Sequence, residues 1–466
     1  MRVGVRVECR ELRRLVIVVL LTLLCGCQDA VRPSILLVTV DTLRADHVGA
    51  YGFEANTTPN LDALAGEGVV FERALAASSR TAPSHATMMT SRWVRNHSIG
   101  PINGGTRLAH DEPTLASRLH DAGWNTAAFV SNFMLGRRVG LDTGFGIYDD
   151  ELRSAELNRP RVKERSAEDT TELALRWLGP GERDQPFFLW VHYNDPHGPY
   201  VPPPPHDAIS LPTSSDAPAE TTLPVLDQQL GLRGIPAYQK LGDLSDPSEY
   251  HRRYAGEIQY FDASFGRLLA AAESAAAPRP LIVLLTSDHG ESLGEQEIYF
   301  SHGHGTTPEL AHVPFVLRAP GLAPERRRGL VHHVDILPTL LDLAGLPVPD
   351  EASGLPLGSL LAGEAELPTR TVFVDVGTQV SAYRGDRLLR AHVGKRMGNV
   401  ETGSWDSFRW LAGDDTHLQP EPPAPELRAE IMRYLQDRAP MLSAGGLSPE
   451  KKAMLRALGY LPPAPN

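Results

Sequence analysis

Three short segments of the chain carry side chains that could bring a hydroxyl group and a bound cation together. Thr81 opens the stretch Thr-Ala-Pro-Ser-His, while two apolar runs end in polar residues, one in Asp41 and the other in Asp288 and His289. Carboxylates and imidazoles are common ligands of divalent ions in proteins. The pattern therefore indicates a hydroxyl beside a metal site, and it leaves open whether that hydroxyl itself reacts.

The apolar runs before these polar residues are predicted strands of a layered α/β domain. The runs at 186–192 and 281–287 are apolar almost throughout, as expected for strands covered by helices on both faces. Ligands bind at the carboxyl ends of strands in open α/β sheets, where Asp41, Asp288 and His197 fall. Strands are expected at 34–40, 69–75, 126–130, 186–192, 281–287 and 314–318, and helices at 253–277, 332–344 and 451–461.

Two other regions do not follow this alternation of predicted strands and helices. Residues 201–250 are rich in proline, serine and aspartate, which predicts an irregular insertion: either a surface loop or part of the substrate entrance. Beyond about 365, short β-rich runs alternate with turns, which predicts a small C-terminal antiparallel sheet.

The start of the chain is typical of an export signal. Five arginines precede a short apolar run, and the run ends in Leu-Cys-Gly-Cys, with Cys27 as the candidate for lipid attachment. The only cysteines are Cys9, Cys25 and Cys27, so the body after the leader contains no thiol. We therefore expect 1–26 to be a lipoprotein signal peptide and the protein to be an exported bacterial lipoprotein. It would lie on the periplasmic face of the inner or outer membrane, held there by its lipid anchor alone.

The charge balance argues against nucleic acid as a partner. The formal net charge is −12, and the leader removes more arginines than glutamates, so the remaining body is more acidic still. Nucleic-acid binding depends on clustered Lys and Arg, and the sequence shows no basic stripe. It also contains no twelve-residue calcium loop and no Walker-type glycine loop.

Several motifs, taken in order, resemble the sulfatase family of the alkaline phosphatase superfamily. They are Asp-Thr-Leu-Arg-Ala-Asp at 41–46, Thr-Ala-Pro-Ser-His at 81–85, the strand 187–192 leading to Pro-His at 196–197, Ser-Asp-His-Gly-Glu at 287–291, His-Gly-His at 302–304, 334–342 and 455–460. The resemblance covers nearly the whole chain after the leader. It implies a large mixed sheet between helices, with a catalytic domain at 33–364 and a C-terminal subdomain at 365–466 that completes the fold.

The same resemblance implies roles for individual residues. Asp41, Asp288 and His289 would hold one divalent ion, and Thr81 would complete its coordination as the metal-activated nucleophile. The residues after Pro83 would begin a helix whose free N–H groups favour an oxyanion. His197 and either His304 or His302 would contact substrate oxygens or protonate the leaving group, whereas His47, His85 and His192 would be packing or supporting residues.

The chain also departs from the family pattern. Active sulfatases use a formylglycine made from Cys or Ser at the position of Thr81, and His85 replaces the signature arginine. The usual Lys-x-His is replaced by Val-Ser-Asn at 130–132, and His289 stands where Asn is usual. A nitrogen ligand suits Mn or Zn better than Ca, which prefers oxygen. The single hydroxyl of Thr81 favours phosphate over sulfate esters.

The leading hypothesis is therefore a metal-dependent hydrolase of sulfate or phosphate esters, acting on a small molecule or on a glycan or lipid ester. One alternative is a transferase that passes a phosphoryl-linked group to a glycan or lipid. The other is an inactive sulfatase-like lipoprotein that binds its ligand without turnover.

Overall fold

The computed structural model describes residues 31–437, apart from 98, 101–106, 181–182, 212–221, 364–365, 397–398 and 411–417. The expected signal peptide, Cys27 and the helix predicted at 451–461 lie outside the described residues. Among the helices that are described, none has the length and apolar character needed to cross a lipid bilayer.

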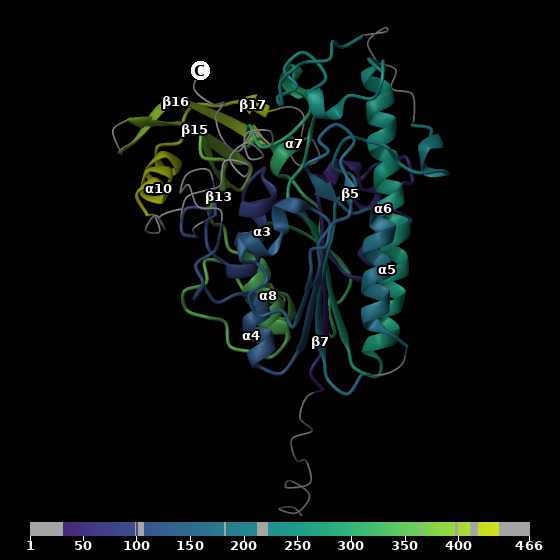
Figure 1. Ribbon diagram of the computed structural model, residues 1–466. Helices are drawn as coiled ribbons and strands as arrows, with labels where there is room; N and C mark the ends of the chain where they lie inside the picture. The colour runs from purple at the N-terminus through teal and green to yellow at the C-terminus, as the bar shows by residue number, and fades with distance from the viewer. Residues whose placement is uncertain are drawn as a thin grey trace, which may run out of the picture.

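An eight-stranded mixed sheet forms the centre of the fold (Figure 1). Its order is β12-β2-β11-β8-β1-β7-β3-β4, with β1 parallel to both neighbours and β11 antiparallel to both of its own. The strands are β1 (Ser34–Val40), β2 (Val69–Leu75), β3 (Asn125–Phe129), β4 (Ile147–Asp149), β7 (Phe187–Tyr193), β8 (Leu281–Ser287), β11 (Phe315–Arg318) and β12 (Glu325–His332).

Helices cover both faces of this sheet, as Figure 1 shows. One face carries α3 (Thr81–Thr90), α4 (Leu115–Asp121), α8 (Ile336–Leu343) and α9 (Leu357–Ala362), and the other carries α2 (Pro59–Glu67), α5 (Ala167–Leu178) and α6 (Pro247–Ala276). Alternate residues of β1 enter opposite cores: Ile35 and Leu37 pack on the α3 side, and Leu36 and Val38 on the α6 side. This double burial explains why the central strands are apolar over most of their length.

Short elements complete the loops at the carboxyl end of the sheet. Two small hairpins, β5–β6 and β9–β10, lie there, together with short helical turns. Their bounds are β5 (Ser154–Ala155), β6 (Lys163–Glu164), β9 (Ser292–Leu293), β10 (Tyr299–Ser301), α7 (Pro308–Ala311), η1 (Ala45–His47), η2 (Gly49–Tyr51), η3 (Phe133–Leu135), η4 (Arg137–Val139), η5 (His206–Ala208), η6 (Ala237–Gln239), η7 (Glu295–Glu297) and η8 (His333–Asp335).

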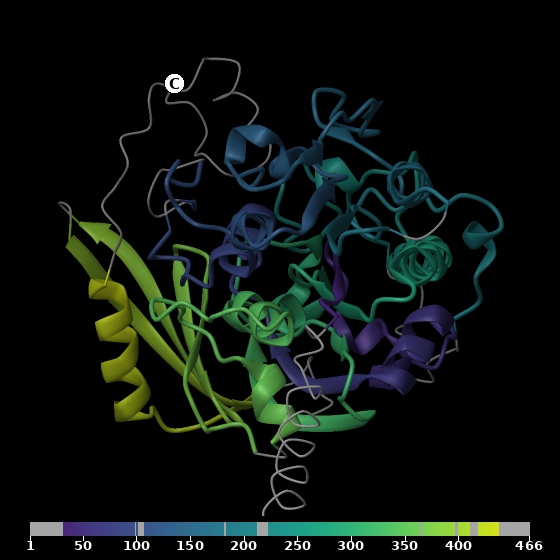
Figure 2. The same ribbon diagram turned by 90° about the horizontal axis from the view of Figure 1, so that it is seen from below.

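A second, antiparallel sheet follows in the C-terminal part and lies beside the main domain, on the side away from α6 (Figure 2). Its order is β13-β14-β15-β16-β17, with α10 packed on it. The bounds are β13 (Val372–Asp375), β14 (Gln379–Arg384), β15 (Arg387–Arg396), β16 (Asn399–Trp410), β17 (Leu418–Pro420) and α10 (Pro425–Gln436). Buried Arg95 joins the two parts, with its Nε 2.7 Å from Asp375 Oδ2.

The mixed sheet, the covering helices and the C-terminal antiparallel sheet confirm the predicted fold class. All six predicted strands occur, with bounds that shift by one residue at most. β12 was not predicted because it begins with Glu325 and three arginines, which do not form an apolar run. Such charged residues are tolerated because β12 lies at the edge of the described sheet. α6 starts earlier than the predicted 253, because the Asp246 side chain accepts a hydrogen bond from Ser248 N–H at its amino end. The predicted helix at 332–344 is η8 followed by α8.

The Arg95–Asp375 pair predicts a large loss of stability when one partner is removed. Both side chains are fully buried, so Arg95→Met leaves an uncompensated carboxylate and should lower the free energy of unfolding by about 3–5 kcal/mol. Chemical denaturation measures this loss. Arg387→Met, which removes partly exposed pairs with Glu426 and Glu421, is the matched control and should cost less than about 1 kcal/mol. Equal losses in the two variants would contradict the prediction.

Candidate active site

The carboxyl ends of three neighbouring strands bring the predicted metal ligands together. Val40, the last residue of β1, is paired with Tyr193 of β7 on one side and with Ser287 of β8 on the other. Asp41 and Asp288 therefore leave adjacent strands at the same edge of the sheet, although they are far apart in the sequence. Asp41, Asp288 and His289 form a buried group whose ligand atoms lie within 4.8 Å of one another.

A tight turn after β1 fixes the first two of these side chains. Thr42 has a φ of 58°, in the left-handed region, and its N–H donates to Asp288 Oδ1 at 3.3 Å. Ser287 Oγ donates to Val40 O at 2.7 Å and accepts from Leu43 N–H at 3.0 Å. The left-handed conformation of Thr42 therefore does more than turn the chain, because its N–H also holds the Asp288 carboxylate in place.

The orientation of His289 would allow it to bind a metal ion. Its Nδ1 lies 2.9 Å from Gly290 O and must donate there, which leaves a lone pair on Nε2 of the neutral ring. That Nε2 lies 3.7 Å from Asp41 Oδ1 and 3.6 Å from Asp288 Oδ2. Neither carboxylate oxygen has a hydrogen-bond partner, although both are buried. Three acceptors that face one another without a donor fit a bound cation.

The pKa values of the two carboxyl groups agree with this fit. Burial raises the pKa of Asp41 well above its ordinary value, and the charge of Glu291 adds to this, while the hydrogen bond from Asn132 opposes it. Burial also raises the pKa of Asp288, with the charge of Asp41 adding to it. A divalent ion between the two carboxylates would remove the cost of keeping both charged.

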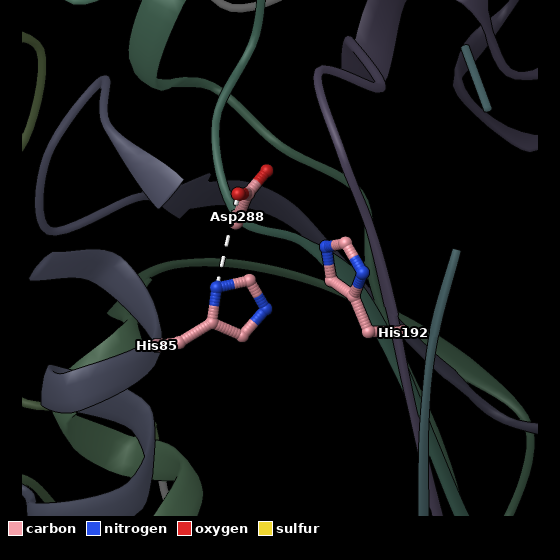
Figure 3. Close-up of side chains that lie close together, drawn as sticks. All are labelled: His85, His192 and Asp288. Carbon is pink, nitrogen blue, oxygen red and sulfur yellow. Dashed lines mark ion pairs between the residues drawn. The ribbon is translucent and has the colours of Figure 1, made fainter. Parts of the chain in front are cut away.

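A second buried group contains His85, His192 and Asp288 (Figure 3). Both nitrogens of His85 already have partners, since Nδ1 lies 2.8 Å from Thr81 O and Nε2 3.0 Å from Thr39 Oγ1. In Figure 3 the His85 ring points from α3 toward Asp288, with Nδ1 3.8 Å from the carboxylate. His85 therefore holds the backbone of Thr81 beside the candidate metal ligands.

His192 supports the site from β7. Ser131 N–H lies 3.5 Å from its Nδ1, which puts the proton of a neutral ring on Nε2. That nitrogen lies 3.7 Å from Asp41 Oδ2 and has no hydrogen-bond partner. Asn132 Nδ2 donates to the same carboxylate oxygen at 2.8 Å. These two side chains orient the Asp41 carboxylate and leave its other oxygen for the cation.

Thr81 lies at the first position of α3, with its Oγ1 3.5 Å from His289 Nε2. The expected helix after Pro83 in fact begins earlier, because Arg80 is the N-cap residue and Pro83 is accommodated in the first turn. The N–H groups of Thr81 and Ala82 have no carbonyl one turn before them within the helix. The hydroxyl thus lies where the amino end of a helix favours negative charge.

Thr81 opens into a polar pocket that also contains two of the predicted histidines. Burial lowers the pKa of His302 to about 3, with the charge of Arg159 adding to this, and burial likewise lowers the pKa of His197. Both imidazoles are therefore neutral near pH 7. The pocket is lined by Thr81, Asn132, Met134, Glu156, Arg159, Val162, Lys163, Glu164, Asn194, His197 and His302.

His302 is oriented by a buried carboxyl group, and His304 is placed differently. His302 Nδ1 lies 3.0 Å from Glu291 Oε1, and the His302 ring lies 4.7 Å from that of His289 and 5.1 Å from that of His197. His304 Nε2 instead lies 3.3 Å from Ser292 Oγ, and His304 is not among the residues that line the pocket. The sequence left these two histidines as alternatives, and the geometry favours His302.

Several residues in or beside the pocket were not singled out from the sequence. Glu291 was quoted only within a motif, and Asn132 was noted only as part of a missing Lys-x-His. Arg159 and Lys163 come from a polar stretch with no periodicity, so no sequence pattern could have placed them beside Thr81. Such positions depend on the path of a long loop rather than on a strand end.

Comparison with known proteins agrees with this site and fold. The family model described as Sulfatase matches residues 33–346. The Delta 4,5-hexuronate-2-O-sulfatase of Bacteroides thetaiotaomicron is 26% identical over 464 residues, covering 89% of this chain and 90% of that protein. A multifunctional alkaline phosphatase superfamily protein of Trinickia caryophylli is 25% identical over 403 residues, covering 71% and 77%.

The solved structure of BT4656 with its substrate D-glucosamine-2-N,6-O-disulfate has the same fold. Its TM-score is 0.67 at 19% identity, covering 87% of this chain and 97% of that one. Since the family model alone spans more than half of the 466 residues, the chain belongs to the sulfatase family of sulfuric ester hydrolases.

Proposed function

We propose that this protein hydrolyses sulfate or phosphate esters with Thr81 as its nucleophile and one divalent ion as its cofactor, and that it favours phosphate. One observation carries the proposal. Thr81 Oγ1 lies 3.5 Å from His289 Nε2, the nitrogen that bears the lone pair. The Asp41 and Asp288 oxygens beside that nitrogen have no hydrogen-bond partner. A degenerate relative would have no need to keep these four groups together.

The cofactor is proposed to be a single Mn, Zn or Ca ion, with the first two favoured. Asp41, Asp288 and His289 would hold it, and Thr81 would complete the set. The donors are a mixture of carboxylate oxygen and imidazole nitrogen, which suits Mn or Zn better than Ca. When bound, such an ion supplies charge that lowers the pKa of a neighbouring alcohol and stabilises an oxyanion.

The reaction would take two steps, formation of an ester on Thr81 and its hydrolysis by water. Thr81 Oγ1 forms a bond to the sulfur or phosphorus atom while the bond to the leaving oxygen breaks, and the Thr81 proton passes through a pocket imidazole to the leaving alcohol. Water then attacks the same atom, the bond to Thr81 breaks, and the water proton returns to Thr81. His302 is the preferred proton carrier because Glu291 fixes its ring, and His197 lies beside it.

The preference for phosphate follows from the single hydroxyl of Thr81. A formylglycine hydrate carries two hydroxyls on one carbon, so that the second can expel a bound sulfate. Thr81 has no second hydroxyl, and its covalent ester must be cleaved by water, as phosphothreonine esters can be. An acceptor alcohol in place of water would give the transferase reaction instead. Lipid attachment at Cys27 and a periplasmic location stay predictions from the sequence.

Replacing Thr81 should test the nucleophile directly. In the metal-loaded protein, Thr81→Ala should lower kcat on the best substrate by roughly 10³-fold or more, whereas Thr81→Ser keeps a hydroxyl and should retain turnover. Initial rates on aryl sulfate, phosphate monoester, phosphate diester and phosphonate esters would be compared. Turnover that survives Thr81→Ala would remove Thr81 from the mechanism, and faster hydrolysis of the sulfate would contradict the preference for phosphate.

The two alternative histidines should behave differently. His302→Ala should lower kcat by about 10²- to 10⁴-fold, since it removes the proton carrier, while His304→Ala leaves the pocket lining intact and should change kcat far less. Steady-state kinetics over a range of pH would separate the two. A larger loss in His304→Ala would reverse the assignment.

Metal binding should be visible without any substrate. At a free Mn or Zn concentration of 100 times Kd, binding should stabilise the fold by about 2.7 kcal/mol and raise Tm. Asp288→Asn keeps the shape of the side chain but removes its charge, and should abolish the shift. Asp169→Asn, which alters an exposed carboxylate of α5, is the matched control. Unchanged metal content in Asp288→Asn, measured by elemental analysis, would contradict the site.

A further inference from the structure

The hairpin β5–β6 closes one side of the Thr81 pocket and is tied to the end of β3. Arg165 N–H donates to Ser131 O at 3.0 Å, and Asn132 and Glu164 form an isolated β-bridge. The segment held in this way is Val-Ser-Asn at 130–132. The family pattern has a lysine in this segment, and this chain has no lysine there. The hairpin therefore lies against the segment 130–132, in which the positively charged lysine of the family pattern is absent.

Two cations of this hairpin line the pocket, and they differ in their partners. Arg159 is held by Glu156, at 2.6 and 2.7 Å, and lies over the Tyr238 ring at 4.4 Å. Its charge is therefore compensated, and its position is fixed. Lys163 is half-buried and pairs with none of the carboxylates in the described part of the chain. Lys163 therefore supplies the pocket with a positive charge that no direct ion pair with a described residue neutralises, although Glu156 and Glu164 also line the pocket.

The chemistry of the site calls for such a charge. A metal ion would be offset by Asp41 and Asp288, and Arg159 is paired with Glu156, so an incoming sulfate or phosphate group meets few positive groups that are free to bind it. An ammonium group binds such oxygens by charge-assisted hydrogen bonds, which are stronger than those between neutral groups. Arg80 also lies near, with its side chain against Gly303, but it is not among the residues that line the pocket.

We propose that Lys163 binds a non-bridging oxygen of the sulfuryl or phosphoryl group, and that the hairpin β5–β6 is the oxyanion-recognition element in place of the missing lysine. The ion pair of Arg159 with Glu156 holds the loop of this hairpin. Asn158 anchors the same loop to the irregular insertion, because its Nδ2 donates to Tyr238 O and Lys240 O at 2.7 Å each. The inference rests on the proposed function in that it places the substrate anion at Thr81.

Binding of inorganic phosphate to the metal-loaded protein tests this proposal without turnover. Titration calorimetry should show a Kd for phosphate that is about 10- to 100-fold higher in Lys163→Met than in the natural protein. Lys163→Arg should recover most of the affinity. Arg161→Met is the matched control, since it removes an exposed cation from the same hairpin, and it should leave Kd unchanged. An unchanged Tm in each variant shows that the fold is intact.

Kinetics separate this inference from the proposed function. Lys163→Met should raise KM more than it lowers kcat, because the contact exists before the reaction begins. Unchanged phosphate affinity and KM in Lys163→Met, together with loss of turnover in Thr81→Ala, would overturn the role of Lys163 alone. Weakened phosphate binding in Lys163→Met with turnover that survives Thr81→Ala would support Lys163 and refute Thr81 as nucleophile.

Discussion

The structure depends on a group of buried acceptors that have no donor among themselves. The Asp41 and Asp288 carboxylates face the lone pair of His289 at distances below 4 Å, at the centre of the widest sheet. Such an arrangement is unfavourable unless a positive charge lies between the groups. The strained turn at Thr42, the amide of Asn132 and the imidazoles of His85 and His192 all act to keep these acceptors, or Thr81 beside them, in place.

This constraint also explains why the fold could be predicted well. The strands that carry the acceptors are buried on both faces, so their sequences are almost wholly apolar and end abruptly in a charged residue. That contrast made Asp41, Asp288 and His289 candidates, and the resemblance to the sulfatase family implied their role as metal ligands. The edge strand β12 lacks the contrast because one of its sides meets no described neighbour, and arginines are tolerated there.

The rest of the site could not be predicted for a physical reason. Lys163, Arg159 and Glu156 belong to a hairpin whose strands contain two residues each, and its position depends on ion pairs and backbone contacts with distant segments. Propensity and periodicity carry no information about such contacts. The alternatives His302 and His304 were equivalent in sequence for the same reason, since only the path of the loop brings His302 to Glu291.

The position of β1 between β7 and β8 has a consequence for how the proposed metal ion would be bound. The ligands leave two strands that lie far apart in the sequence, at 34–40 and 281–287, so the unfolded chain holds no preformed site. The strands of the sheet must pair before the proposed ion could be bound by all of its ligands. The choice of ion would then depend on the geometry of the folded site as well as on the intrinsic affinity order of free ligands.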